Sequence, residues 1–251
     1  MGETSHAEGD SSTASGDLSH AEGGTTIASG ACSHAEGYYT TASGDSSHAE
    51  GKSTIASGIV SHAEGSGTNA SGDLSHAEGD ETTASGACSH AEGKSTTAGG
   101  PFSHAEGDST RSSGNSSHAE GKSTRALALG SHAEGHATTA NSQYQHVQGK
   151  HNIDDSENKY AHIVGNGSGS SNVGNQRSNA HTLDWSGNAW FSGDVYVGST
   201  SGTNKDEGSK KLVTEEYVDN KFSNGLILTD ESTGTKYRVF IKDAKLNLEV
   251  V

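Results

Sequence analysis

The sequence Ser-His-Ala-Glu-Gly recurs ten times at intervals of 14 residues, with its histidines running from His6 to His132. A fixed short period indicates one small structural unit stacked many times, so more than half of the chain is predicted to be a repeat array and not an ordinary globular domain. Only 28% of the residues are hydrophobic, and the formal net charge is −16. Such a composition is usual for disordered chains. The strict period instead favours a narrow coil that is filled by small side chains and bonded to its neighbours.

Each 14-residue unit divides into two halves of seven residues. The first half is Ser-His-Ala-Glu-Gly plus two residues, and the second is typically Thr-x-Ala-Ser-Gly plus two residues. Five alternating residues followed by a two-residue polar link predict a short strand and a turn, and two strands make one coil. Alternation places Ser, Ala and Gly inside the coil and directs His and Glu outward. Because stacked coils lie ~4.8 Å apart, ten coils are expected to span about 48 Å.

The outward His and Glu form two columns that are identical in all ten units, whereas the position equivalent to His in the second strand varies among Thr, Ile, Asn and Arg. A solvated face permits such variation, so the identical face is predicted to be the constrained one. Its members are His6, Glu8, His20, Glu22, His34, Glu36, His48, Glu50, His62, Glu64, His76, Glu78, His90, Glu92, His104, Glu106, His118, Glu120, His132 and Glu134. The last residue of the unit is often apolar and suggests a third column, a seam against a partner: Leu18, Cys32, Val60, Leu74, Cys88, Phe102 and Tyr144.

The half-repeat resembles the head repeat of trimeric autotransporter adhesins of the YadA type, over about residues 5–149. The resemblance implies an all-β fold, a left-handed parallel β-roll of 14-residue coils that forms a homotrimer. It also implies that the outward columns meet at the threefold axis, where that family usually carries Val and Ile of a Ser-Val-Ala-Ile-Gly motif. Here His and Glu occupy those positions, so a polar pair replaces an apolar one.

Three roles for the His and Glu columns are open. The favoured role is structural: each His donates to a Glu of its own or a neighbouring protomer, which fixes the register between identical coils. The second is a zinc site made by three imidazoles around the axis. The third, a catalytic dyad, is disfavoured because repeated and equivalent residues do not create one pocket with distinct pKa values. Because the structural role is favoured, we predict no enzyme activity, no cofactor and no bound metal, with metal binding as the alternative. Cys32 and Cys88 lie four coils apart, about 19 Å, which is too far for a disulfide within one protomer.

The C-terminal hundred residues depart from the repeat. After the β-roll at 1–149, we expect degenerate repeats and short strands at 150–198, a linker at 199–210, a short helix at 211–224 and a small antiparallel β meander at 225–251. Val218 and Phe222 are the predicted contacts of this helix in the trimer. Residues 179–198 and the helix resemble segments of tail, appendage and fibre proteins of phages and prophages of Gram-positive bacteria.

The resulting functional hypothesis is a trimeric structural rod of a phage or prophage tail, located in the virion and serving host-surface attachment. Its expected partners are itself, other tail or baseplate proteins, and a host cell-surface glycan or protein. Multivalent presentation would raise the effective concentration for repeated surface ligands. The acidic charge argues against nucleic acid. No apolar run approaches the roughly 20 residues that cross a bilayer, and no signal peptide is evident, so no membrane association is predicted.

Several alternatives accompany this hypothesis. The first is a fragment of a bacterial trimeric surface adhesin, since the chain reads as if it begins inside a longer array. The second is a metal-binding or ice-binding β-roll, although alternation places most Thr residues of the second half inside the coil. A glycan-cleaving enzyme would need paired carboxylates in a cleft. Asp154, Asp155 and Glu157 cluster in one loop, but a solvated acidic turn is the favoured interpretation there.

Overall fold

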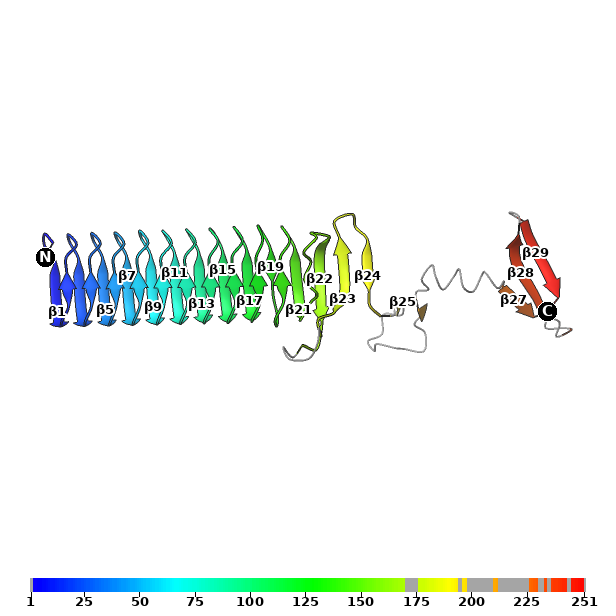
Figure 1. The fold of residues 1–251 in the computed structure, drawn as a ribbon, viewed down its shortest axis with the longest axis horizontal. Helices are drawn as coiled ribbons and strands as arrows, with labels where there is room; N and C mark the ends of the chain where they lie inside the picture. The colour runs from blue at the N-terminus through cyan, green and yellow to red at the C-terminus, as the bar shows by residue number, and fades with distance from the viewer. Residues whose placement is uncertain are drawn as a thin grey trace. The chain divides into compact units, whose positions relative to one another are not determined.

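A computed structural model describes residues 2–169, 176–193, 196–197, 210–211, 226–229, 233, 236–242 and 245–250. Its contacts divide the chain into two units, Met1–Ser192 and Gly193–Val251. The first unit is a stack of β coils (Figure 1). Segments 14 residues apart pair in parallel, as His6 does with His20. The predicted all-β fold with a parallel β-roll of 14-residue coils is therefore confirmed. No helix that is long and apolar enough to cross a membrane occurs in the described part of the chain.

The coils present two parallel sheets. The Ser-His-Ala-Glu-Gly half supplies the first sheet, in which His pairs with His and Glu with Glu from coil to coil. Its repeat strands are β1 (His6–Asp10), β3 (His20–Gly24), β5 (His34–Tyr38), β7 (His48–Lys52), β9 (His62–Ser66), β11 (His76–Asp80), β13 (His90–Lys94), β15 (His104–Asp108), β17 (His118–Lys122), β19 (His132–Ala133) and β21 (His146–Lys150).

The second half of each unit supplies the second sheet, whose ten strands have two residues each. They are β2 (Thr13–Ala14), β4 (Ile27–Ala28), β6 (Thr41–Ala42), β8 (Ile55–Ala56), β10 (Asn69–Ala70), β12 (Thr83–Ala84), β14 (Thr97–Ala98), β16 (Arg111–Ser112), β18 (Arg125–Ala126) and β20 (Thr139–Ala140).

Small side chains fill the interior, as the alternation predicts. Ala21 of the first sheet and Ala28 of the second are completely buried, and their equivalents repeat this through the stack. Thr26 is also completely buried and Ser19 almost so, with its hydroxyl donating to the Gly16 carbonyl over 2.6 Å. A coil this narrow needs no large apolar side chain because neighbouring coils supply its hydrogen bonds. The inward position of Thr also removes the regular outward Thr rows that an ice-binding face requires.

The glycine that ends Ser-His-Ala-Glu-Gly corrects the predicted alternation. Gly23 was expected inside, but it is exposed and has φ +112°. A Cβ on Gly23 would clash with the carbonyl oxygen of Gly37 in the next coil. The backbone bends at this position and passes close to the coil above it, so only a residue without a side chain fits.

The links between strands contain residues in the left-handed region, one about every seven residues. Leu18 has φ 57° and Thr25 has φ 58°. Val60 also has a positive φ, 56°, despite its branched Cβ. Each such conformation costs about 1 kcal/mol or more outside glycine. The amide of Cys32, another of these residues, donates to the carbonyl of Asp17 in the previous coil over 2.8 Å. Bonds between coils thus hold the strained turns in place.

The first sheet continues beyond the regular repeats. β22 (Tyr160–Asn166) pairs in parallel with β21, with His162 opposite His146, as expected for a degenerate unit after an insertion. β23 (Asn179–Asp184) and β24 (Ala189–Phe191) then add in antiparallel order. The ladder of parallel coils therefore ends in a β hairpin.

A buried polar cluster lies under the insertion and corrects the expectation of a solvated acidic turn. Asp155 is only 6% exposed, whereas Asp154 and Glu157 are exposed. The Asp155 carboxylate accepts hydrogen bonds from the Gln145 side chain (3.0 Å), the Ser142 hydroxyl (3.2 Å) and the Tyr160 amide (2.8 Å). Two regular repeat positions change here, because Gln145 stands where earlier units have Ser and Ser142 where most have Gly. The bonds from these two side chains let Asp155 hold the insertion against the last coil.

The second unit contains short antiparallel strands. β25 (Tyr196–Val197) pairs with β26 (Lys210–Lys211). β27 (Leu226–Thr229), β28 (Lys236–Lys242) and β29 (Lys245–Val250) form the predicted antiparallel meander. Of the helix predicted at 211–224, Lys211 lies in β26, and the rest, with Val218 and Phe222, lies outside the described residues.

Candidate functional site

The histidines of the first sheet form a continuous stack. Parallel pairing in register places each imidazole directly above the one in the previous coil. From His6 to His146, adjacent ring centroids are 4.7 to 5.0 Å apart, and the rings are within 22° of parallel. This spacing is the distance between strands in a sheet. The column is thus a direct consequence of the 14-residue period.

The glutamates form a second column two residues further along each strand. His34 Nε2 lies 3.8 Å from a Glu22 oxygen and 3.9 Å from a Glu36 oxygen, so this imidazole stands between the carboxylates of two coils. His48 and His62 are placed in the same way. Across the columns these distances run from 3.4 to 4.0 Å. They exceed the 2.7–3.2 Å of a hydrogen bond. The structural interpretation, in which His donates to Glu, is therefore not realised by direct hydrogen bonds inside one protomer.

The Nε2 atoms of this stack are buried without a hydrogen-bond partner. The side chains themselves are about one-third exposed, for example 36% for His62. A buried polar atom without a partner costs about 1–3 kcal/mol. The same atom is unpartnered in ten histidines, namely His20, His34, His48, His62, His76, His90, His104, His118, His132 and His146.

An open groove runs beside the columns. Its first section has a volume of about 870 Å³ and its second about 480 Å³. Glutamates form its wall, and its floor is glycine backbone, because the Ser-His-Ala-Glu-Gly glycines carry no side chain. Glu8, Gly9, Glu22, Gly23, Glu36, Gly37, Glu50, Gly51, Glu64, Gly65 and Gly79 line the first section, and Glu92, Gly93, Glu106, Gly107, Glu120, Gly121, Glu134 and Gly135 line the second.

Contacts between neighbouring carboxyl groups shift the pKa of three stacked glutamates. Hydrogen bonds to Glu36 and Glu64 raise the pKa of Glu50 from 4.5 to about 7. The reciprocal bonds to Glu50 and Glu22 lower the pKa of Glu36. A hydrogen bond to Glu36 and then burial raise the pKa of Glu22. The pKa shifts of Glu22, Glu36 and Glu50 therefore alternate in direction from one coil to the next.

Burial disfavours the charged form of the imidazoles. It lowers the pKa of His48, His62 and His118 below 6.5, and neighbouring imidazoles of the stack add to the effect. Nearby carboxylates act in the opposite direction but do not reverse it. At neutral pH these rings are thus neutral and present a lone pair or a proton at Nε2, depending on the tautomer.

Most predicted site residues lie together on this one face. The first pair of the columns differs from the others in its exposure. His6 and Glu8 are exposed, whereas the other members are half-buried. The third column is exposed in the protomer, with Leu18 63% and Phe102 62% exposed. Cys32 and Cys88 are exposed free thiols.

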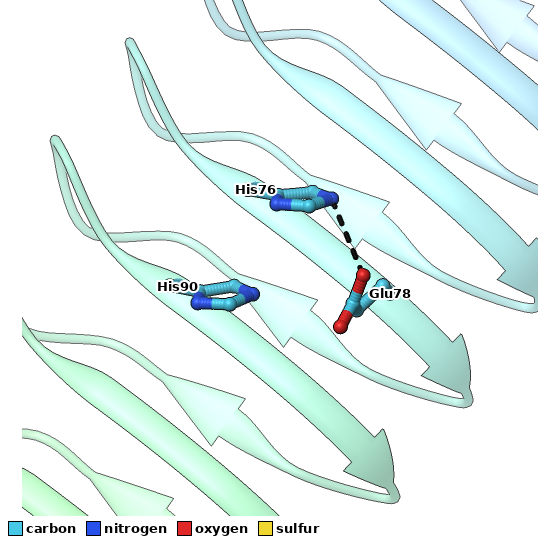
Figure 2. A group of neighbouring side chains, drawn as sticks. All are labelled: His76, Glu78 and His90. Carbon is cyan, nitrogen blue, oxygen red and sulfur yellow. Dashed lines mark ion pairs between the residues drawn. The ribbon is translucent and has the colours of Figure 1, made fainter.

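Neighbouring coils bring imidazoles and carboxylates close enough to share a metal ion. His76, Glu78 and His90 offer ligand atoms within 4.8 Å of one another (Figure 2). Figure 2 shows both rings on adjacent coils with the carboxylate beside them. Sequence reasoning placed three imidazoles around an axis but missed this combination within one chain. The parallel register, which brings residue i beside residue i+14, could have indicated it.

Comparison with known families supports the repeat assignment. The model of the YadA head domain repeat matches two copies, at residues 1–32 and 35–61. The matched coils are therefore similar to the repeats of YadA-type adhesin heads. Head domains of this type form homotrimers and lie exposed at a surface, and the adhesin-like repeats are in general not enzymes. The remaining coils keep the same strand pairing as the matched ones. No curated protein matches the chain.

Proposed function

We propose that this chain is a structural attachment protein, a homotrimer in which the His and Glu columns of three protomers face a common threefold axis. The observation that carries the proposal is the row of buried Nε2 atoms that find no hydrogen-bond partner in the protomer, on the face that is identical in all ten coils. A face so uniform and so incompletely bonded is the natural place for contacts with other copies.

The half-exposed state of the columns supports this arrangement. Glu36 and His34 keep about one-third of their side chains exposed, and the groove beside them is open. Three such faces around an axis would let each imidazole reach a carboxylate of another protomer, directly or through water in the groove. Buried polar pairs add less stability than apolar packing, but they can fix the register between identical coils.

The function that follows is presentation. The trimer would carry three copies of the C-terminal unit, and three copies raise the effective concentration for repeated ligands such as cell-surface glycans. The C-terminal resemblance favours a phage or prophage tail with baseplate or tail proteins as neighbours. The match to the head repeat fits a fragment of a bacterial surface adhesin equally well.

The oligomeric state tests the proposal. Light scattering coupled to size-exclusion chromatography should give three times the 25.6 kDa of one chain, with elution earlier than a compact protein of that mass. A monomer at micromolar concentration would leave the columns facing solvent and would reject the axial arrangement.

The location of the protein distinguishes a phage or prophage tail component from a bacterial surface adhesin. Antibodies against the purified chain should label the tails of particles released after prophage induction if the protein is a tail component. Labelling of intact cells with none on purified particles would instead identify the surface adhesin.

A further inference from the structure

We propose that pairs of adjacent coils bind a zinc-type divalent cation within one protomer. The first site consists of His76 Nε2, the Glu78 carboxylate and His90 Nε2. The equivalent set in the last coils is His132, Glu134 and His146. The proposal does not rest on the trimer, because all three ligands of each site come from one chain.

The distances suit a small rearrangement toward a metal. His76 Nε2 lies 3.8 Å from a Glu78 oxygen, and all three ligand atoms of the site lie within 4.8 Å of one another. Zinc bonds of about 2.0–2.1 Å in tetrahedral geometry separate the ligand atoms by about 3.4 Å. The separation of His146 Nε2 and Glu134 Oε1 is already 3.4 Å. Because the side chains are about one-third exposed, rotation about their χ angles can close the rest.

The donor atoms suit a metal ion of intermediate softness such as zinc. Two imidazole nitrogens and one carboxylate oxygen are typical zinc ligands and leave a fourth position for water. Both Nε2 atoms of the first site are buried and have no hydrogen-bond partner within the protomer, so a metal would occupy donors that the chain itself leaves unused. Other clusters on the same face, such as Glu22, His34 and Glu36, offer one imidazole and two carboxylates. That set suits zinc less well, since it supplies fewer nitrogens.

Competition for ligands limits how many ions bind. Each Nε2 has one lone pair, so an imidazole that binds one ion cannot serve the next coil. His90 therefore belongs either to a site with His76 or to one with His104. Adjacent pairs of coils cannot both be filled. Ions are expected on alternate pairs of coils, about two coil spacings apart.

The test is zinc binding by the full-length chain after treatment with a chelator. Isothermal titration with ZnCl₂ at pH 7.5, followed by metal analysis after dialysis, should show at least two zinc ions bound per chain. The double variant Glu78→Gln/Glu134→Gln should lose two of these ions or bind them about tenfold more weakly. The matched control Glu81→Gln/Glu157→Gln removes the same charge from exposed positions outside the columns and should keep the full number.

The wild-type protein provides a second readout that needs no variant. Co²⁺ in place of zinc should give visible absorption of the intensity typical of four-coordinate nitrogen and oxygen ligands. Absence of zinc after dialysis, equal binding by both double variants, or a Co²⁺ spectrum no different from that of the free ion would overturn the proposal. Zinc is counted per chain, so these results are independent of whether the protein is a monomer or a trimer.

Discussion

The two sheets of the β-roll share one interior and differ completely outside. Ala35 in the first sheet and Ala42 in the second are both fully buried, and the strands of both pair in parallel with a period of 14 residues. Outside, the first sheet repeats His and Glu without change, while the second carries Thr, Ile, Asn or Arg. The coil itself thus constrains its inner residues and the glycine at the bend, but not the outer side chains of the two sheets. The uniformity of the outer His and Glu requires another cause, and contacts with other copies or with metal ions are the ones proposed here.

The largest expected effect concerns the shared interior. Ala77→Leu places three extra carbon atoms in a coil that has no room for them, so we expect a loss of about 3 kcal/mol or more in unfolding free energy. Thr83→Leu adds a larger side chain on the outward row of the second sheet and should change stability little. Thermal melting followed by circular dichroism measures both. Equal melting temperatures for the two variants would mean that the interior is not tightly packed.

The next effect concerns the bend that ends each strand of the first sheet. Gly23→Ala introduces a Cβ at φ +112° that meets the Gly37 carbonyl, and it should destabilise the protein by about 1–3 kcal/mol. Gly193→Ala is the matched control, because a Cβ there has open space. If Gly23→Ala melts at the wild-type temperature, the two coils do not approach each other at this position as closely as the structure indicates.

The third effect concerns the outer faces of the two sheets, which differ in the His and Glu columns. His34→Val/Glu36→Ile replaces one polar pair by the residues usual in the head repeats that this chain resembles. If three columns meet at the axis, the trimer should become more stable by about 1–4 kcal/mol. Thr41→Val on the second sheet should have almost no effect. Loss of the trimer, or a lower melting temperature for the column variant, would show that the polar pair itself is required.

The smallest expected effect is pH dependence of the columns with a chelator present. His48 has a pKa below 6.5 in the folded chain, so the unfolded chain binds more protons and stability falls as the pH drops below 6.5. Glu50, with its pKa raised to about 7, binds its proton more readily when folded and so stabilises the fold as the pH falls from 7 toward 4.5. Glu50→Gln removes this opposing contribution.

Melting temperatures between pH 7.5 and 4.5 test this balance. The wild-type temperature should fall by a few degrees below pH 6.5, and that of Glu50→Gln should fall more steeply. Ser15→Ala, on the exposed outer face of the second half-repeat, serves as the control and should follow the wild type. A flat profile for all three proteins would contradict the titration of the columns.

Much of the architecture could be predicted because a period is a local property that the stack repeats. The in-register pairing of His6 with His20, the buried Ala21 and the inward Thr26 all follow from a 14-residue unit with alternating small residues. The same reasoning located β22 and the C-terminal meander, because alternation persists there. It failed for Gly23, where a positive φ interrupts the alternation, and for Asp155, whose burial depends on an insertion folding back on the last coil.

The candidate site likewise has features that the sequence predicts and features that depend on the folded structure. The sequence by itself determined that His and Glu form two columns on one face, since residues that repeat at the coil period must lie above one another. Only the tertiary structure decided that Nε2 and the carboxylates stand 3.4 to 4.0 Å apart, too far to bond and near enough to share an ion. The distance between Nε2 and the carboxylates depends on the spacing of the strands, the rotamers of the side chains and the bend at glycine. All three are determined by the packing of whole coils against one another.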